Sequence, residues 1–194
     1  MPVSGAEPHT DDVGTALLVV DVQTGVLQDN PGSEAVLPII VTLVDAARSA
    51  GSDVVWVQHD DDDLAPGSAE WQLAPGLSPR PGELMIRKQH RSAFADTGLT
   101  TALRQRGVDH VVLVGVQSAF CVDLAGKHAL TEGFDVTLVG DAHANGALGT
   151  TAGTLTDEQV RAMVNRTWST LRHPGRRVDV VESDDVEWSA VAQD

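Results

Sequence analysis

The sequence predicts an α/β protein of three layers, in which helices cover both faces of a doubly wound, mostly parallel sheet. Short apolar runs rich in β-branched residues recur along the chain, as expected of strands that are buried on both faces. Segments with apolar residues at helical spacing alternate with these runs, which is typical of a parallel sheet. The chain has 194 residues, of which 42% are hydrophobic, so it is long enough to bury a substantial core.

The first part of the chain contains an arm, a strand and a long helix. Residues 1–14 are polar, with no periodicity, and are expected to form a flexible arm. The apolar run over residues 16–20 is the first expected strand. Ser33 is a suitable N-cap for a helix that reaches about residue 50 and stops at Gly51.

The remaining segments continue the alternation of strands and helices. Residues 60–82 are rich in Asp, Pro and Gly, and a loop of this length in a compact domain is usually functional or mobile. Thr156 and Gln159 have the spacing of a capping box at the start of the last helix. The expected strands lie at residues 54–58, 84–88, 111–116, 136–139 and 178–181, and the expected helices at residues 99–106, 122–133 and 156–171.

Ionisable residues stand at the ends of three of these strands. Asp21 follows the first strand, Lys88 closes the third, and Cys121, the only cysteine, follows the strand at residues 111–116. In an open α/β sheet, ligands bind beyond the carboxyl ends of the strands, where the strand order reverses. In a shared pocket, a carboxylate can accept the thiol proton, an ammonium can stabilise both anions, and a thiolate can attack an electrophilic carbon.

The position of Cys121 makes it a candidate nucleophile. It stands between an apolar run and a segment patterned as a helix. A thiol in the first turn of a helix is close to the positive end of the helix dipole, so its pKa is expected to fall. A lone cysteine is more often a small buried hydrophobe. The ionisable residues at the two other strand ends favour the nucleophile.

Composition restricts the partners and the location. One cysteine allows no intramolecular disulfide, and with no apolar leader in the sequence this indicates the cytoplasm. No apolar run approaches the roughly 20 residues that cross a bilayer, so no membrane span is expected. The formal net charge of -15 argues against nucleic acid or an anionic membrane as a partner.

Three segments resemble the signature blocks of the isochorismatase-like cysteine hydrolases. They are residues 16–23 (ALLVVDVQ), Lys88 with the Ser92-Ala93-Phe94 that follows it, and residues 115–122 (GVQSAFCV). The order and wide spacing of the blocks match as well, and the resemblance extends from about residue 15 to about residue 171. It implies a single isochorismatase-like hydrolase domain over residues 15–194.

The resemblance also implies a catalytic machinery. The Asp-Lys-Cys triad of the family falls on Asp21, Lys88 and Cys121. The family has a cis peptide bond before the nucleophile turn, here between Val116 and Gln117. The N–H groups of Gln117 and Cys121 would then form the oxyanion hole.

The implied reaction is hydrolysis of a C–N bond, in an amide or lactam of a small molecule, through a covalent acyl-enzyme on Cys121. No cofactor is expected, and relatives commonly assemble as homo-oligomers. One alternative is the isochorismate-type cleavage of a vinyl ether, against which a cysteine at the nucleophile position argues. Another is a non-catalytic binding protein of the same fold. A Cys-His arrangement is a weaker alternative, because His128 lies about two helical turns beyond Cys121.

Further residues are candidates for binding. The expected substrate contacts are Gln23, Trp71, Phe94 and Val116. His59 and the four aspartates after it could hold a metal, but the Asp-x-His pair of the nicotinamidases of this family is missing. We therefore interpret this segment as a solvated acidic loop and predict no metal. Asp141 and His143 could contact the site, although an aspartate after a strand more often ties a loop.

Overall fold

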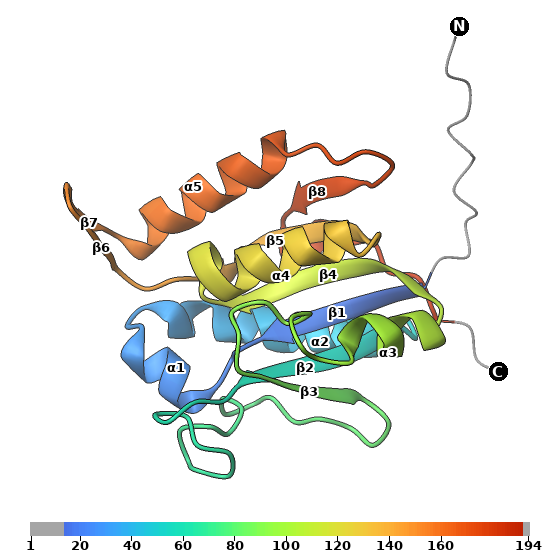
Figure 1. Ribbon diagram of the computed structural model, residues 1–194, viewed down its shortest axis with the longest axis horizontal. Coiled ribbons are helices and arrows are strands. Elements are labelled where there is room, and N and C mark those ends of the chain that lie inside the picture. Colours follow the sequence, from blue (N-terminus) through green and yellow to red (C-terminus); the bar gives the residue numbers. More distant parts are fainter. Residues whose placement is uncertain (1–13, 192–194) are drawn as a thin grey trace, which may run out of the picture.

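The computed structural model describes residues 14–191 of the chain, and the predicted arm over residues 1–14 lies outside them except for Gly14. A six-stranded sheet forms the centre, in the order β3-β2-β1-β4-β5-β8 (Figure 1). All neighbouring strands in it are parallel. The strands are β1 (Gly14–Val20), β2 (Asp53–His59), β3 (Leu84–Lys88), β4 (Val108–Val116), β5 (Asp135–Ala144) and β8 (Val178–Val181).

The strand order reverses beside β1. The chain passes from β1 to β2 and β3 on one side of the sheet, and then returns to add β4, β5 and β8 on the other side of β1. The carboxyl ends of β1 and β4 therefore flank the point where ligands bind in folds of this kind. Asp21 follows β1, and the segment with Cys121 follows β4.

Helices cover both faces of the sheet, as predicted (Figure 1). Side chains alternate along β1, so that Leu18 contacts one helical layer and Leu17 the other. All seven residues of β1 are buried. On one face lies α2 (Leu37–Ser49), and on the other lie α3 (Leu99–Gln105), α4 (Asp123–Thr131) and α5 (Asp157–Thr170).

The short helix α1 (Thr24–Asp29) follows β1 directly and was not predicted from the sequence. Further short elements are the 3₁₀ turns η1 (Ser33–Val36) and η3 (Ser183–Asp185), the π-helical turn η2 (Ser118–Val122) and the antiparallel hairpin of β6 (Leu148–Thr150) and β7 (Gly153–Leu155). Among residues 14–191, no helix has the length and apolar character needed to cross a bilayer.

Local signals placed several elements correctly. The third strand has the predicted bounds, and the capping box is present: the Thr156 hydroxyl accepts from the N–H of Gln159, whose side chain accepts from the N–H of Thr156. The prediction that a helix begins directly after Ser33 was wrong. The first turn is 3₁₀, and the α-helix begins at Leu37 because Pro38 is favoured in a first helical turn, where no intrahelical N–H is needed.

Strand β5 is longer than predicted. The sequence indicated a strand that ends at Val139, whereas β5 continues to Ala144. Its register against β4 shifts, so that Leu113 faces Leu138 but Gly115 faces His143. Such a bulge redirects side chains at the end of a strand. Here it brings the end of β5 against the turn that contains Cys121.

Candidate active site

Asp21, Lys88 and Cys121 lie together at the carboxyl edge of the sheet. The Lys88 ammonium is 2.7 Å from Oδ2 of Asp21 and 3.5 Å from Sγ of Cys121. The three side chains come from the ends of β1, β3 and β4, and β2 lies between β1 and β3 in the sheet order. One ammonium therefore contacts both an acid and a thiol, as the chemistry of the predicted triad requires.

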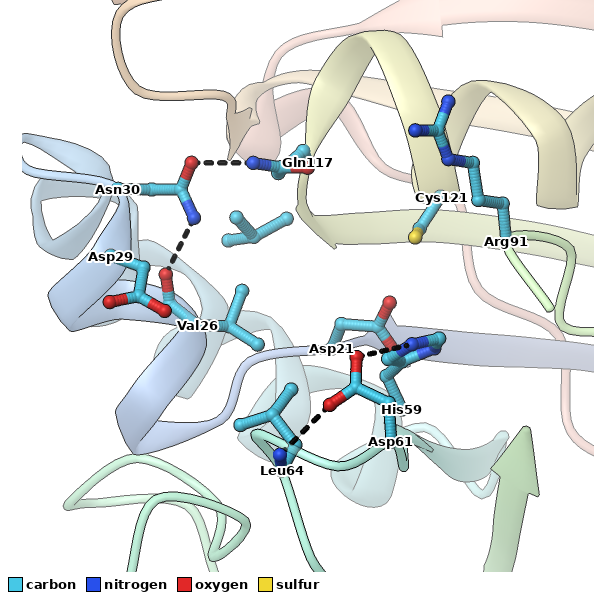
Figure 2. A pocket seen from close by; sticks show the side chains of 11 residues that line it. Asp21, Val26, Asp29, Asn30, His59, Asp61, Leu64, Arg91, Gln117 and Cys121 are labelled. Carbon is cyan, nitrogen blue, oxygen red and sulfur yellow. Dashed lines mark hydrogen bonds and ion pairs between the residues drawn. The ribbon is translucent and has the colours of Figure 1, made fainter. Parts of the chain in front are cut away.

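Asp21 is a buried carboxylate with one oxygen committed to Lys88. Its backbone has φ 52, in the left-handed region that non-glycine residues rarely adopt, and its N–H donates to the carbonyl of Val57. Oδ1 has no hydrogen-bond partner among the described residues. In Figure 2, a carboxylate oxygen of Asp21 points toward the sulfur of Cys121. Burial raises the pKa of Asp21, an effect that Lys88 opposes.

Cys121 lies in the π-helical turn η2, ahead of the first residue of α4. The predicted fall in its pKa is wrong. The pKa of the Cys121 thiol is raised to about 12, chiefly by burial and also by the charge of Asp21, while Lys88 opposes the rise. The cost of removing the thiolate from water is thus larger than its stabilisation by the Lys88 ammonium. Near neutral pH the thiol carries its proton, so a base must remove that proton before attack.

Side chains at the end of β5 and just after it hold the turn that contains Cys121. The Ser118 hydroxyl lies 2.7 Å from Nδ1 of His143, and Nε2 of His143 lies 2.8 Å from Oδ1 of Asn165. Asn145 accepts the N–H of Ala119 at 3.0 Å. His143 therefore supports the turn, while Asp141 ties the chain to Ser183. No motif or pattern in the sequence singles out Asn145 or Asn165.

The peptide bond between Val116 and Gln117 is cis. The Gln117 N–H makes no hydrogen bond to another residue in the described part of the chain. Its side-chain amide donates to Oδ1 of Asn30 at 2.5 Å, which holds the Gln117 side chain against α1 (Figure 2). Gln117 thus stands beside Cys121 at the mouth of a common cavity.

This cavity has a volume of about 330 Å³, a size that suits a small molecule. Figure 2 shows side chains from α1, from the loop after β2 and from the turn that contains Cys121 around it. The lining residues are Asp21, Val26, Asp29, Asn30, His59, Asp61, Leu64, Arg91, Val116, Gln117 and Cys121. Sequence reasoning did not single out those of α1 or Arg91, because they belong to no motif.

Of the four predicted substrate contacts, Val116 lines the cavity and the other three do not. Gln23 is fully buried, and its amide donates to the carbonyls of His59 and Trp71 while accepting the N–H of His59. Gln23 is thus occupied in joining α1 to the loop after β2. The ring of Phe94 packs in the core at 6.0 Å from that of Phe134. The Trp71 ring lies under the Arg87 guanidinium, on the loop.

Two histidines that were considered for other roles, His59 and His128, contact neighbouring side chains through both ring nitrogens. Nδ1 of His128 contacts the Ser92 hydroxyl at 2.8 Å, and its Nε2 faces Glu132. His59 contacts Lys88 through Nδ1 and Asp61 through Nε2, at 3.2 Å in both cases. Within residues 14–191, no group of three or more His, Cys, Asp or Glu side chains is arranged to hold a metal ion.

Residues 15–169 match the model of the isochorismatase domain, and the chain belongs to this family. A solved isochorismatase from Pseudomonas putida KT2440 has the same fold, with a TM-score of 0.80 and 25% identity, over 89% of this chain and 90% of that one.

Two relatives are similar in sequence to this chain. A streptothricin hydrolase of Streptomyces noursei is 38% identical over 135 residues, which cover 66% of this chain and 54% of the relative. The chain thus spans about half the length of that protein. A secreted isochorismatase effector, Isc1 of Verticillium dahliae, is 30% identical over 146 residues, which cover 71% of this chain and 77% of the effector.

Proposed function

We propose that this protein hydrolyses a C–N bond, in an amide or lactam of a small molecule, through a covalent acyl-enzyme on Cys121. The observation that carries the proposal is the shared ammonium of Lys88, which lies 2.7 Å from Asp21 and 3.5 Å from Cys121. This arrangement supplies a base, a nucleophile and a cation that stabilises the anionic form of each.

In the first half-reaction, Oδ1 of Asp21 takes the proton of the Cys121 thiol. Asp21 suits this role because burial raises its pKa, which makes its carboxylate a stronger base. The thiolate attacks the carbonyl carbon, and the N–H groups of Gln117 and Cys121 hold the oxyanion. The tetrahedral intermediate then collapses: the C–N bond breaks, and the nitrogen takes the proton that Asp21 returns. The amine of an amide substrate leaves, whereas that of a lactam stays attached to the acyl group.

In the second half-reaction, water replaces the amine. Asp21 is again a carboxylate and removes a proton from a water molecule, whose oxygen attacks the thioester carbon. The C–S bond breaks, the carboxylic acid leaves, and the proton on Asp21 returns to the Cys121 sulfur. Two moderate barriers replace the single high barrier of direct amide hydrolysis.

The relationship to a streptothricin hydrolase makes streptothricin the first compound to test. The sequence-based expectations of a cytoplasmic location and of a homo-oligomer stay predictions. Gel filtration with light scattering tests the oligomer, and fractionation of the source cells tests the location.

The deciding experiment is intact-mass spectrometry of the protein after exposure to streptothricin and to a panel of small amides and lactams. Because the chain has a single cysteine, an acyl adduct on a thiol has one possible position. We expect a transient adduct that carries the acyl half of an amide substrate, or the whole of a lactam substrate because its amine stays attached, and no turnover by Cys121→Ala. Cys121→Ala that folds normally and keeps full turnover would overturn the proposal.

A further inference from the structure

We propose that His59 is a positioning residue: it accepts a hydrogen bond from Lys88 and so holds the ammonium between Asp21 and Cys121. This inference rests on the proposed function, because the proposed function assigns Lys88 to the triad with Asp21 and Cys121. His59 is the last residue of β2 and lies directly opposite Lys88, the last residue of β3, in the register of the two parallel strands.

Lys88 requires three acceptors. An ammonium group has three N–H donors and no acceptor, and the Lys88 side chain has no exposed surface. Asp21 Oδ2 lies at 2.7 Å from Nζ, and the Cys121 sulfur lies at 3.5 Å. His59 Nδ1, at 3.2 Å, supplies the third acceptor. Without it, one N–H of a buried cation would lack a partner, and the ammonium could rotate away from the thiol.

The same contact fixes the proton of the imidazole. Since the ammonium can only donate, Nδ1 of His59 must present its lone pair, and the ring proton is on Nε2. Nε2 lies 3.2 Å from Oδ2 of Asp61, which accepts that proton in a hydrogen bond. Figure 2 shows this contact at the cavity wall. Both ring nitrogens are thus engaged, so His59 is not free to exchange protons with a substrate.

The groups on either side of His59 are themselves held in place. Oδ1 of Asp61 accepts the N–H groups of Asp63 and Leu64, which fixes the first turn of the loop after β2. The N–H and carbonyl of His59 both bond to the side chain of Gln23. The loop after β2 is therefore connected to the Lys88 ammonium through one oriented ring. Gln23 is buried and does not reach the cavity, because its side chain is used to hold the backbone of His59.

The first test measures the tautomer of His59 by NMR of protein with ¹⁵N-labelled histidine, near neutral pH. We expect Nε2 to carry the proton and Nδ1 to be bare. Lys88→Met should shift the Nδ1 resonance, whereas Lys127→Met, at a surface lysine paired with Asp123, should not. A proton on Nδ1 of His59 in the wild-type protein would overturn the proposal.

The second test measures how fast iodoacetamide alkylates Cys121, which needs no substrate. His59→Leu should lower the alkylation rate about tenfold, because a buried N–H loses its acceptor and the thiolate loses its cation. His59→Asn, whose amide oxygen can replace Nδ1, should stay within about threefold of the wild type. His90→Leu is the matched control, because His90 is exposed.

The two proposals fail in different ways. If iodoacetamide alkylates Cys121 in His59→Leu and in His59→Asn at the wild-type rate, His59 does not position Lys88, whatever reaction the enzyme carries out. If Cys121→Ala retains turnover, the covalent mechanism fails, although the histidine contact can still be confirmed by the tautomer measurement.

Discussion

Lys88 and Asp21 form an ion pair that is almost completely removed from solvent, with Nζ 2.7 Å from Oδ2 and side-chain exposures of 0% and 3%. Each charge is stable at this position because the other is present. The pair therefore serves both the fold and the proposed reaction. A variant that removes one charge should affect stability as well as activity, and the two effects can be separated.

Lys88→Met tests the dependence of one charge on the other. The substitution leaves Asp21 buried without its cation, so we expect the free energy of unfolding to fall by about 3–5 kcal/mol. Adding Asp21→Asn removes the remaining charge and should restore part of that stability, although the double variant stays inactive. Urea unfolding of the two single variants and the double variant measures the coupling. Strictly additive losses would contradict a direct interaction.

Alkylation of Cys121 should depend on pH in the manner of a buried thiol. Because the pKa of Cys121 is raised to about 12, the alkylation rate should keep rising through the alkaline range. Asp21→Asn should speed alkylation at a given pH, because the carboxylate raises the thiol pKa, yet it should abolish hydrolysis. A time course by intact mass measures both. A plateau at or below the pKa of a free cysteine, about 8.5, would contradict this prediction.

The sequence predicted those parts of the site that depend on local pattern. An apolar run followed by Asp21, and another closed by Lys88, identify strand ends, and parallel strands bring such ends to one edge of a sheet. The motif around Cys121 located the turn, but the pKa of the thiol depends on how completely distant segments cover it. A local argument from the helix dipole contains no information on that burial.

Physical reasons also explain why the sequence did not predict the extension of β5 and why Gln23 and Phe94 do not line the cavity. Gly140 and Asp141 interrupt the apolar pattern of β5, so the extension that carries His143 does not look like a strand. For Gln23 and Phe94, a motif indicates the neighbourhood of the site but not the direction of the side chain. The Gln23 side chain makes hydrogen bonds to the loop after β2, and the Phe94 ring packs in the core.

Two buried histidines should make the protein sensitive to acid. Burial lowers the pKa values of His110 and His143 to about 4 from 6.5. In the unfolded chain these histidines bind protons more readily than in the folded protein. The stability that the folded protein gains by keeping them neutral is therefore complete above pH 6.5 and is lost as the pH falls toward 4. The loss should be roughly 3 kcal/mol per histidine.

Urea unfolding over this pH range measures the loss. The double variant with His110→Gln and His143→Gln should be less stable near neutral pH, because four hydrogen bonds change, but its stability should vary less with acidification. An equally steep loss of stability in the double variant would assign the acid sensitivity to other groups.

Gly115 is expected to tolerate no side chain. It faces Val20 across the β1–β4 pair, has φ 128, and a Cβ there would lie 2.1 Å from the Val20 carbonyl oxygen. Neither backbone can yield without moving Asp21, which follows Val20, or the Val116–Gln117 segment. Gly115→Ala should therefore lower the free energy of unfolding by about 3 kcal/mol or more and disturb the triad.

Gly149→Ala is the matched control for this substitution. Gly149 lies in the short strand β6, and a Cβ there meets no atom within 4 Å, so the change should stay within about 0.5 kcal/mol. Urea unfolding compares the stabilities, and alkylation of Cys121 reports on the triad. Equal stability of the two variants would mean that the β1–β4 contact can relax. In that case the close approach of β1 and β4 at Gly115 would not determine the distance between Asp21 and Cys121.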